Sequence, residues 1–114
     1  MYILYGLKNC DTVKKARAWL EAHAIAYQFV DFKQTPPTAA ELERWHAHFG
    51  EWPVNRQGTT YRQLKAAYEQ ADSAQQLALL LAQPAALKRP ILEGNGVLLK
   101  GFSAELWSQA LQTR

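Results

Sequence analysis

The order in which strand-like and helix-like patterns follow one another is the feature that most constrains this fold. A short apolar run at residues 2–5 ends at Gly6 and is typical of a buried strand. The next segment has apolar residues at helical spacing on one face: Val13, Ala16, Leu20 and Ala24. We expect Asp11 or Thr12 to cap this helix. Aromatic and β-branched residues at 27–32 predict a second strand. The intervening helix allows the two strands to pair in parallel.

Residues 36–86 predict a block of helices. Thr38 and Glu41 form a capping box, and Gly50 is a plausible helix stop. We expect a second helix capped by Thr59 or Thr60. A third should begin at a capping box of Ser73 and Gln76 and end before Pro84.

The strand pattern returns at residues 90–92 and 97–99. Asn95-Gly96 lies between these apolar runs and is a strong signal for a hairpin. Ser103 can cap a last helix. The full order is therefore βαβ, a helical insertion, then ββα, which predicts an α/β fold.

The chain has 114 residues, enough for one domain with its own core, and a single cysteine. One cysteine excludes an internal disulfide, and the sequence offers no cluster typical of a structural zinc site. We expect no metal, since His46 and His48 point away from each other on a helix. The net charge of +3 suits small anionic ligands and is weak support for nucleic acid. With neither a long apolar run nor a leader-like start, we expect a cytoplasmic protein without membrane association.

Cys10 is the main candidate for chemistry. It precedes a predicted helix start, where amide donors and the helix dipole favour a thiolate, and Lys8 adds positive charge nearby. The alternative is a buried, inert cysteine, but Asn9, Asp11 and Thr12 are polar neighbours. The Thr12 hydroxyl suits either a hydrogen bond to the sulfur or a helix cap. Val13 occupies the position where a C-x-x-C dithiol would have its second cysteine, so reduction needs an external thiol such as glutathione.

Two arginines stand where a guanidinium is useful for binding an anion. Arg56 lies in a predicted loop and Arg89 directly precedes Pro90. Arginine forms bidentate bonds to carboxylates and oxyanions. On these residues alone, both also fit ordinary surface charges.

The sequence resembles the arsenate reductase (ArsC)/Spx family, in particular its YffB-like branch. The resemblance rests on four ordered motifs: residues 5–16, 55–62, 88–92 and 101–103. It implies a thioredoxin-like fold with a mixed four-stranded sheet, made of a core at 1–35 and 87–114 and a helical insertion at 36–86. It also implies that Pro90 is a cis-proline beside the active site.

The resemblance implies a thiol reductase that uses glutathione as co-substrate, glutaredoxin as a partner and a small disulfide or oxyanion as substrate. By motif, Cys10 matches the nucleophile, and Arg56 and Arg89 match two of three anion-binding arginines. Asn9, Thr12, Pro90 and Lys100 complete the predicted binding site.

Lys100 stands near the place of the third arginine and lacks its planar fork. This departure disfavours arsenate as the substrate. The Spx branch binds RNA polymerase and switches through a C-x-x-C pair, which Val13 interrupts here. Arsenate reduction and polymerase binding remain the alternatives to a glutathione-dependent thiol reductase.

Overall fold

The computed structural model describes residues 1–111 and divides into two compact units. One comprises Met1–Thr35 together with the chain from Arg89 onward, and the other is Pro36–Lys88. Each unit is described below by itself. None of the helices in residues 1–111 is long and apolar enough to cross a membrane.

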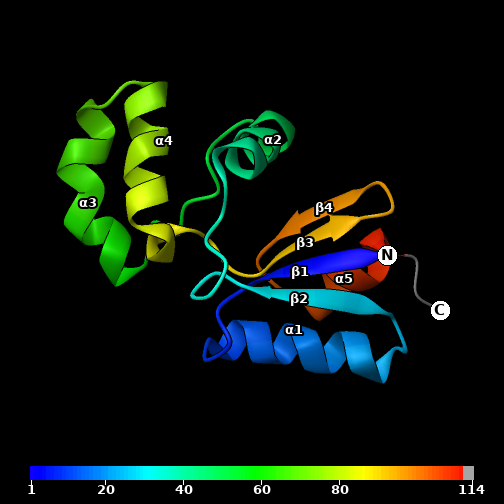
Figure 1. Cartoon of the computed structure of the whole chain (residues 1–114). Helices are drawn as coiled ribbons and strands as arrows, with labels where there is room; N and C mark the ends of the chain where they lie inside the picture. Colours follow the sequence, from blue (N-terminus) through cyan, green and yellow to red (C-terminus); the bar gives the residue numbers. More distant parts are fainter. Residues whose placement is uncertain (112–114) are drawn as a thin grey trace. The chain divides into compact units, whose positions relative to one another are not determined.

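The first unit is built on a mixed four-stranded sheet (Figure 1). Its strands are β1 (Tyr2–Gly6), β2 (Tyr27–Asp31), β3 (Ile91–Gly94) and β4 (Val97–Lys100), in the order β2-β1-β3-β4. β1 pairs in parallel with β2 and antiparallel with β3, and β4 pairs antiparallel with β3. The predicted α/β fold with a mixed sheet is confirmed, and β2 is an edge strand.

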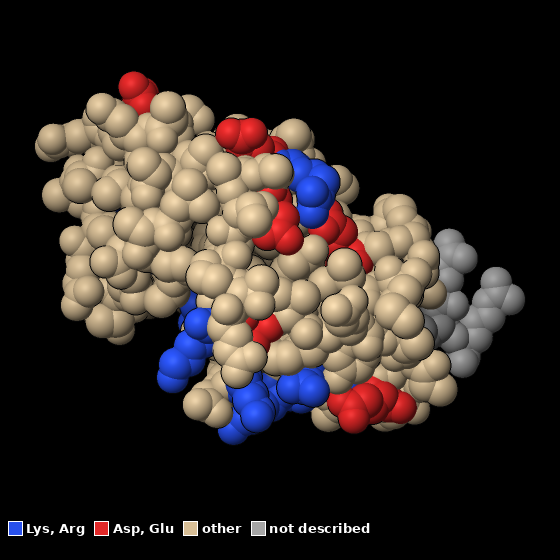
Figure 2. Space-filling model, viewed as in Figure 1, with Lys and Arg blue, Asp and Glu red and all other residues tan. Residues whose placement is uncertain are grey.

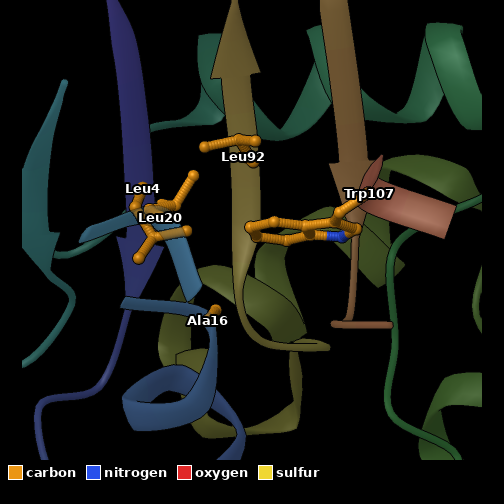
Figure 3. Close-up of a cluster of buried hydrophobic side chains, with 5 residues drawn as sticks. All are labelled: Leu4, Ala16, Leu20, Leu92 and Trp107. Carbon is orange, nitrogen blue, oxygen red and sulfur yellow. The ribbon is translucent and has the colours of Figure 1, made fainter. Parts of the chain in front are cut away.

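Helices α1 (Asp11–Ala22) and α5 (Ala104–Ala110) pack on one face of this sheet. The core between them contains five buried side chains, shown in Figure 3: Leu4, Ala16, Leu20, Leu92 and Trp107. Leu4 and Leu92 face each other across β1 and β3, so their side chains share that face. The Trp107 indole N–H donates to the Gly101 carbonyl at 3.1 Å, which satisfies its buried polar atom.

The β3–β4 hairpin has the two-residue turn that its sequence predicted. Gly94 pairs with Val97, which leaves Asn95-Gly96 as the loop. Both loop residues have positive φ, 50° and 78°, as a type I′ turn requires. Asparagine tolerates this region and glycine favours it, so the local sequence sets the hairpin register.

The second unit is helical. Its elements are α2 (Ala39–Phe49), α3 (Thr59–Gln70), α4 (Ser73–Ala82) and a short 3₁₀ turn, η1 (Pro84–Ala86). An isolated bridge joins Val54, in the loop between α2 and α3, to Leu87, directly after η1. The Thr38–Glu41 capping box and the left-handed Gly50 at the end of α2 are both as predicted.

Three predicted helix caps were wrong by one or two residues. The box that opens α4 consists of Asp72 and Gln75 rather than Ser73 and Gln76, because the Asp72 carboxylate accepts from the Gln75 N–H at 2.8 Å. Gly58 rather than a threonine precedes α3. At the start of α1 the cap is Cys10 itself. Neighbouring polar residues each fit a cap pattern, and only the backbone dihedrals choose between them.

Gly6 allows α1 to approach the end of β1. A Cβ added at Gly6 would lie 2.7 Å from Val13 Cγ2 and 3.4 Å from its Cγ1. Val13 is fully buried in the first turn of α1. The missing side chain therefore determines how closely the helix that begins after Cys10 packs on the sheet.

Gly6→Ala should lower the free energy of unfolding by about 1–3 kcal/mol, the usual cost of overpacking a core. Urea denaturation measures this change. In a Val13→Ala background the same substitution should cost clearly less, because the clashing methyl groups are gone. Equal costs in the two backgrounds would contradict a direct clash between these residues.

Candidate functional site

Cys10 occupies the N-cap position of α1. Its backbone is extended, with φ −80° and ψ 126°, and its carbonyl accepts the first helical hydrogen bond from Lys14 N at 2.9 Å. The thiol is partly buried and forms no disulfide. The Cys10 side chain makes no conventional capping hydrogen bond. The backbone N–H groups of Thr12 and Val13 are nevertheless close enough to stabilise a negative charge on its sulfur. The sulfur thus takes the place that a serine or aspartate oxygen fills in most helix caps.

The pKa of the Cys10 thiol is lowered from its ordinary value. Partial burial raises this pKa, because it penalises the charged form. The Val13 N–H, a hydrogen bond from the Arg89 side chain and the Thr12 N–H lower it, and Arg89 also contributes its charge. The stabilising groups together outweigh burial. The surroundings therefore favour a thiolate, the nucleophilic form of cysteine.

Arg89 reaches Cys10 from the other end of the sequence. The Arg89–Pro90 peptide bond is cis, as the resemblance implied. Pro90 is buried and comes directly before β3, and its carbonyl accepts from Gly101 N at 2.8 Å. This bond joins the start of β3 to the end of β4. The loop that presents Arg89 is thus held to the same sheet as the helix that presents Cys10.

The other predicted site residues of the first unit are Asn9 and Thr12, near Cys10 in the sequence, and Lys100, at the end of β4. Asn9 and Thr12 flank Cys10 and are exposed. The contribution of Thr12 to the pKa of Cys10 comes from its backbone N–H. Because the helix begins at Asp11 and its cap is Cys10, Thr12 is not the cap residue that we considered. Lys100 is half-buried at the end of β4, paired with Ile91 and one residue before the Gly101–Pro90 bond.

Arg56 belongs to the second unit. Its loop is ordered by Asn55, whose side-chain oxygen accepts from Gln57 N at 3.2 Å and whose carbonyl accepts from Gly58 N at 3.1 Å. The exposed Arg56 guanidinium donates from Nη1 to the buried Tyr61 hydroxyl at 3.0 Å. Its carbon Cζ lies 5.5 Å from the centre of the same ring. Its joint action with Cys10 stays a prediction.

Within residues 1–111, no group of three or more His, Cys, Asp or Glu side chains is placed to hold a metal ion. The His46 ring lies 4.2 Å from the Trp52 ring, centre to centre, in the manner of a packing residue.

Two contributions to the site were not visible in the sequence. The Val13 amide acts on Cys10 only because Cys10 is the N-cap, and our cap assignment placed the helix start one or two residues later. The contact of Arg56 with Tyr61 depends on how the Asn55–Gly58 turn meets α3. A tyrosine five residues after an arginine is too weak a signal to predict that contact.

Comparison with known proteins identifies a matching family model and related sequences and structures. The model of the ArsC family matches residues 5–110. The solved structure of the YFFB protein is 45% identical, with a TM-score of 0.87, and the match covers 97% of this chain and 99% of that one. An arsenate reductase (ArsC) related protein from Brucella melitensis is 40% identical, with a TM-score of 0.74 and coverage of 97% and 94%.

Curated relatives include an uncharacterized protein of Haemophilus influenzae, 35% identical over 96% of this chain and 98% of its own length. The global transcriptional regulator Spx 2 of Bacillus cereus is 28% identical over 92% of this chain and 82% of its own. A glutaredoxin from Archaeoglobus fulgidus, 10% identical with a TM-score of 0.54, shares the fold, which is thioredoxin-like. Since the family model covers nearly the whole chain and the relatives match from end to end, this chain belongs to the ArsC family.

Proposed function

We propose that this protein is a glutathione-dependent thiol–disulfide reductase in which Cys10 is the only nucleophile. The observation that carries the proposal is the environment of Cys10: two backbone amides and the Arg89 guanidinium lower the pKa of its thiol. A thiolate at neutral pH is the form that attacks disulfides. The family supports this reading, since it includes a protein described as arsenate reductase related.

The reaction proceeds by two thiol–disulfide exchanges. The Cys10 thiolate attacks the glutathione sulfur of a mixed disulfide, forms a Cys10–glutathione disulfide and releases the substrate thiolate. A second glutathione thiolate then attacks the glutathione sulfur of this intermediate. Oxidised glutathione leaves and the Cys10 thiolate is regenerated. The net reaction converts the mixed disulfide and one free glutathione into the substrate thiol and oxidised glutathione, and no second protein cysteine is required.

The other predicted residues bind and orient the anionic substrates. Arg89 stabilises the Cys10 thiolate, both when it attacks and when it is the leaving group. Arg56 binds a glutathione carboxylate or an oxyanion through its planar fork. Asn9, Thr12, Pro90 and Lys100 line the place where glutathione is bound. Glutaredoxin is the protein partner that would recycle the intermediate, and we place the protein in the cytoplasm.

A regulatory role is the second candidate, because Spx 2 of Bacillus cereus matches over 92% of this chain. In that role the chain would bind RNA polymerase rather than turn over a substrate. A valine at position 13 removes the C-x-x-C switch, so any redox control would need a disulfide to another molecule. Turnover in a glutathione-coupled assay favours the enzyme. Co-purification with polymerase and no turnover favours the regulator.

The rate of Cys10 alkylation by iodoacetamide should rise with pH around a midpoint below about 8.5, the ordinary cysteine pKa. Since the Arg89 hydrogen bond and charge favour the thiolate, Arg89→Gln should move this midpoint upward. Lys14→Gln is the matched control: Lys14 is exposed on the same helix and should leave the midpoint in place. A wild-type midpoint at or above 8.5 would contradict an activated nucleophile.

Arg56→Lys and Arg89→Lys should each weaken glutathione binding, even though both retain the charge. The planar fork is lost, and one charge-assisted hydrogen bond is worth about 1.5–3 kcal/mol. The expected change is about tenfold or more in the KM for glutathione. Unchanged KM values in both lysine variants would show that neither arginine binds substrate.

The Cys10→Ser variant should lack activity but unfold at the same urea concentration as the wild type.

Arsenate should be reduced weakly or not at all, while glutathione mixed disulfides are reduced. Arsenate is a multiply charged anion, and a site with lysine in place of the third guanidinium loses about one to two orders of magnitude in rate. Disulfide exchange needs only the thiolate and its leaving group. Steady-state assays with both substrates at one glutathione concentration compare them. Efficient arsenate turnover without disulfide turnover would reverse this ranking, and a gain on Lys100→Arg would identify the missing fork as the limit.

A further inference from the structure

A second feature of the first unit is a pocket of about 470 Å³ beside the edge strand β2. Lys8 and Arg17 line it from the α1 side. The β2 side and its following turn contribute residues 28–31, Gln34 and Thr35. Figure 2 shows Lys and Arg side chains gathered over the start of α1, the end of that helix nearest Cys10. The motifs that carry the family resemblance include Lys8 but assign this pocket no role.

Aromatic side chains hold the guanidinium of Arg17 in place, with no ion pair among the described residues. Its Nε donates to the Tyr27 hydroxyl at 3.1 Å, and its Cζ lies 4.3 Å from the centre of the Phe29 ring. The Tyr27 hydroxyl in turn donates to the Glu21 carboxylate at 2.8 Å, so this hydroxyl links Arg17 to Glu21. Among residues 1–111 these contacts occupy Nε and one face of Arg17. The terminal nitrogens remain to form a planar pair of donors at the pocket.

The charge of the pocket favours an anion. Lys8 and Arg17 contribute two positive charges, and Asp31 contributes one negative charge. The Asp31 side chain accepts from Lys33 N at 2.9 Å, which directs one of its oxygens to the backbone of the turn. A rigid guanidinium beside a flexible ammonium matches a carboxylate, which a fork binds through two parallel hydrogen bonds.

The position of the pocket links it to Cys10. Arg17 comes seven residues after Cys10, nearly two full turns, so both lie on almost the same side of α1, roughly 10 Å apart along its axis. Lys8 precedes Cys10 by two residues and lines the same pocket as Arg17. A peptide-sized thiol bound at Cys10 can therefore extend an acidic group into the pocket.

We propose that this pocket is a carboxylate-binding subsite, in which Arg17 and Lys8 hold an acidic group of the thiol or disulfide substrate that reacts at Cys10. The assignment to a substrate rests on the proposed function, whereas binding of a carboxylate does not. The substrate class is thus peptide-sized thiols and disulfides that carry a carboxylate some distance from the sulfur. Neutral and cationic disulfides should react less well.

A binding experiment tests the pocket without any redox chemistry. The probes are S-methylglutathione, which cannot exchange disulfides, and its diethyl ester, which lacks both carboxylates. In ¹H–¹⁵N NMR titrations, S-methylglutathione should shift the Arg17 Nε–H and the amides of 28–31, and the ester should not. Arg17→Gln should weaken binding about tenfold, as expected for one charge-assisted hydrogen bond. Lys15→Gln, an exposed neighbour on α1 outside the pocket, should bind like the wild type.

The Asp31→Asn variant tests whether the charge of the pocket, rather than its local structure, controls the affinity for S-methylglutathione. This variant leaves the Arg17 contacts intact and keeps an oxygen for Lys33 N, but removes the opposing charge, so it should bind S-methylglutathione more tightly. Shifts that are absent from 28–31, or equal affinity in the wild type, Arg17→Gln and Asp31→Asn, overturn the subsite.

A kinetic experiment distinguishes the carboxylate-binding subsite from the proposed reductase function. Mass spectrometry follows the formation of the Cys10 mixed disulfide with oxidised glutathione and with its fully esterified form. Arg17→Gln should slow the first reaction about tenfold and leave the second unchanged. If S-methylglutathione binds in the pocket but wild-type Cys10 forms no mixed disulfide, the proposed reductase function fails and the carboxylate site stands. If mixed disulfides form at equal rates in the wild type and Arg17→Gln, the link between pocket and substrate fails.

Discussion

The position of Cys10 as the N-cap of α1 is the constraint on which the candidate site depends. An N-cap side chain faces the first amides of its helix, and here those amides meet a sulfur instead of the usual oxygen. Partial burial alone would favour the neutral thiol. The amides and the Arg89 guanidinium reverse that preference, and they act only while the first turn of α1 is held in place. That turn is held by Val13, which packs against the backbone of Gly6 with no room for a side chain between them.

The sheet brings Arg89 close to Cys10. β3 lies beside β1, and the cis Arg89–Pro90 bond directly precedes β3. The Gly101 N–H to Pro90 carbonyl bond joins the start of β3 to the end of β4, and Lys100 stands next to it. Buried apolar pairs such as Leu4 and Leu92 set the register of these strands. The same hydrophobic core that stabilises the first unit therefore also brings Arg89 to Cys10, across nearly eighty residues of sequence.

Two arginines of this protein, Arg17 and Arg56, are oriented by aromatic rings. Arg17 stacks on Phe29 and donates to Tyr27, and Arg56 donates to Tyr61. A tyrosine hydroxyl or a ring face fixes a guanidinium while leaving its charge uncompensated, unlike a carboxylate partner. Such arginines keep their affinity for an external anion. This distinguishes them from surface arginines in ion pairs, whose donors are already shared.

Features that are encoded within a few residues could be predicted from the sequence alone. These include the order of strands and helices, the Asn95-Gly96 turn, the Thr38–Glu41 capping box and the cysteine at a helix start. Each rests on a local steric or hydrogen-bonding preference that acts before the chain is packed. The sequence could not choose between adjacent polar residues as caps, since Ser73 and Asp72 fit the pattern equally well. Three contacts became visible only in the folded chain: Arg89 donates to Cys10, Val13 packs against Gly6, and Phe29 orients Arg17. These contacts join residues distant in sequence, and their geometry follows from strand register and core packing, which no local pattern contains.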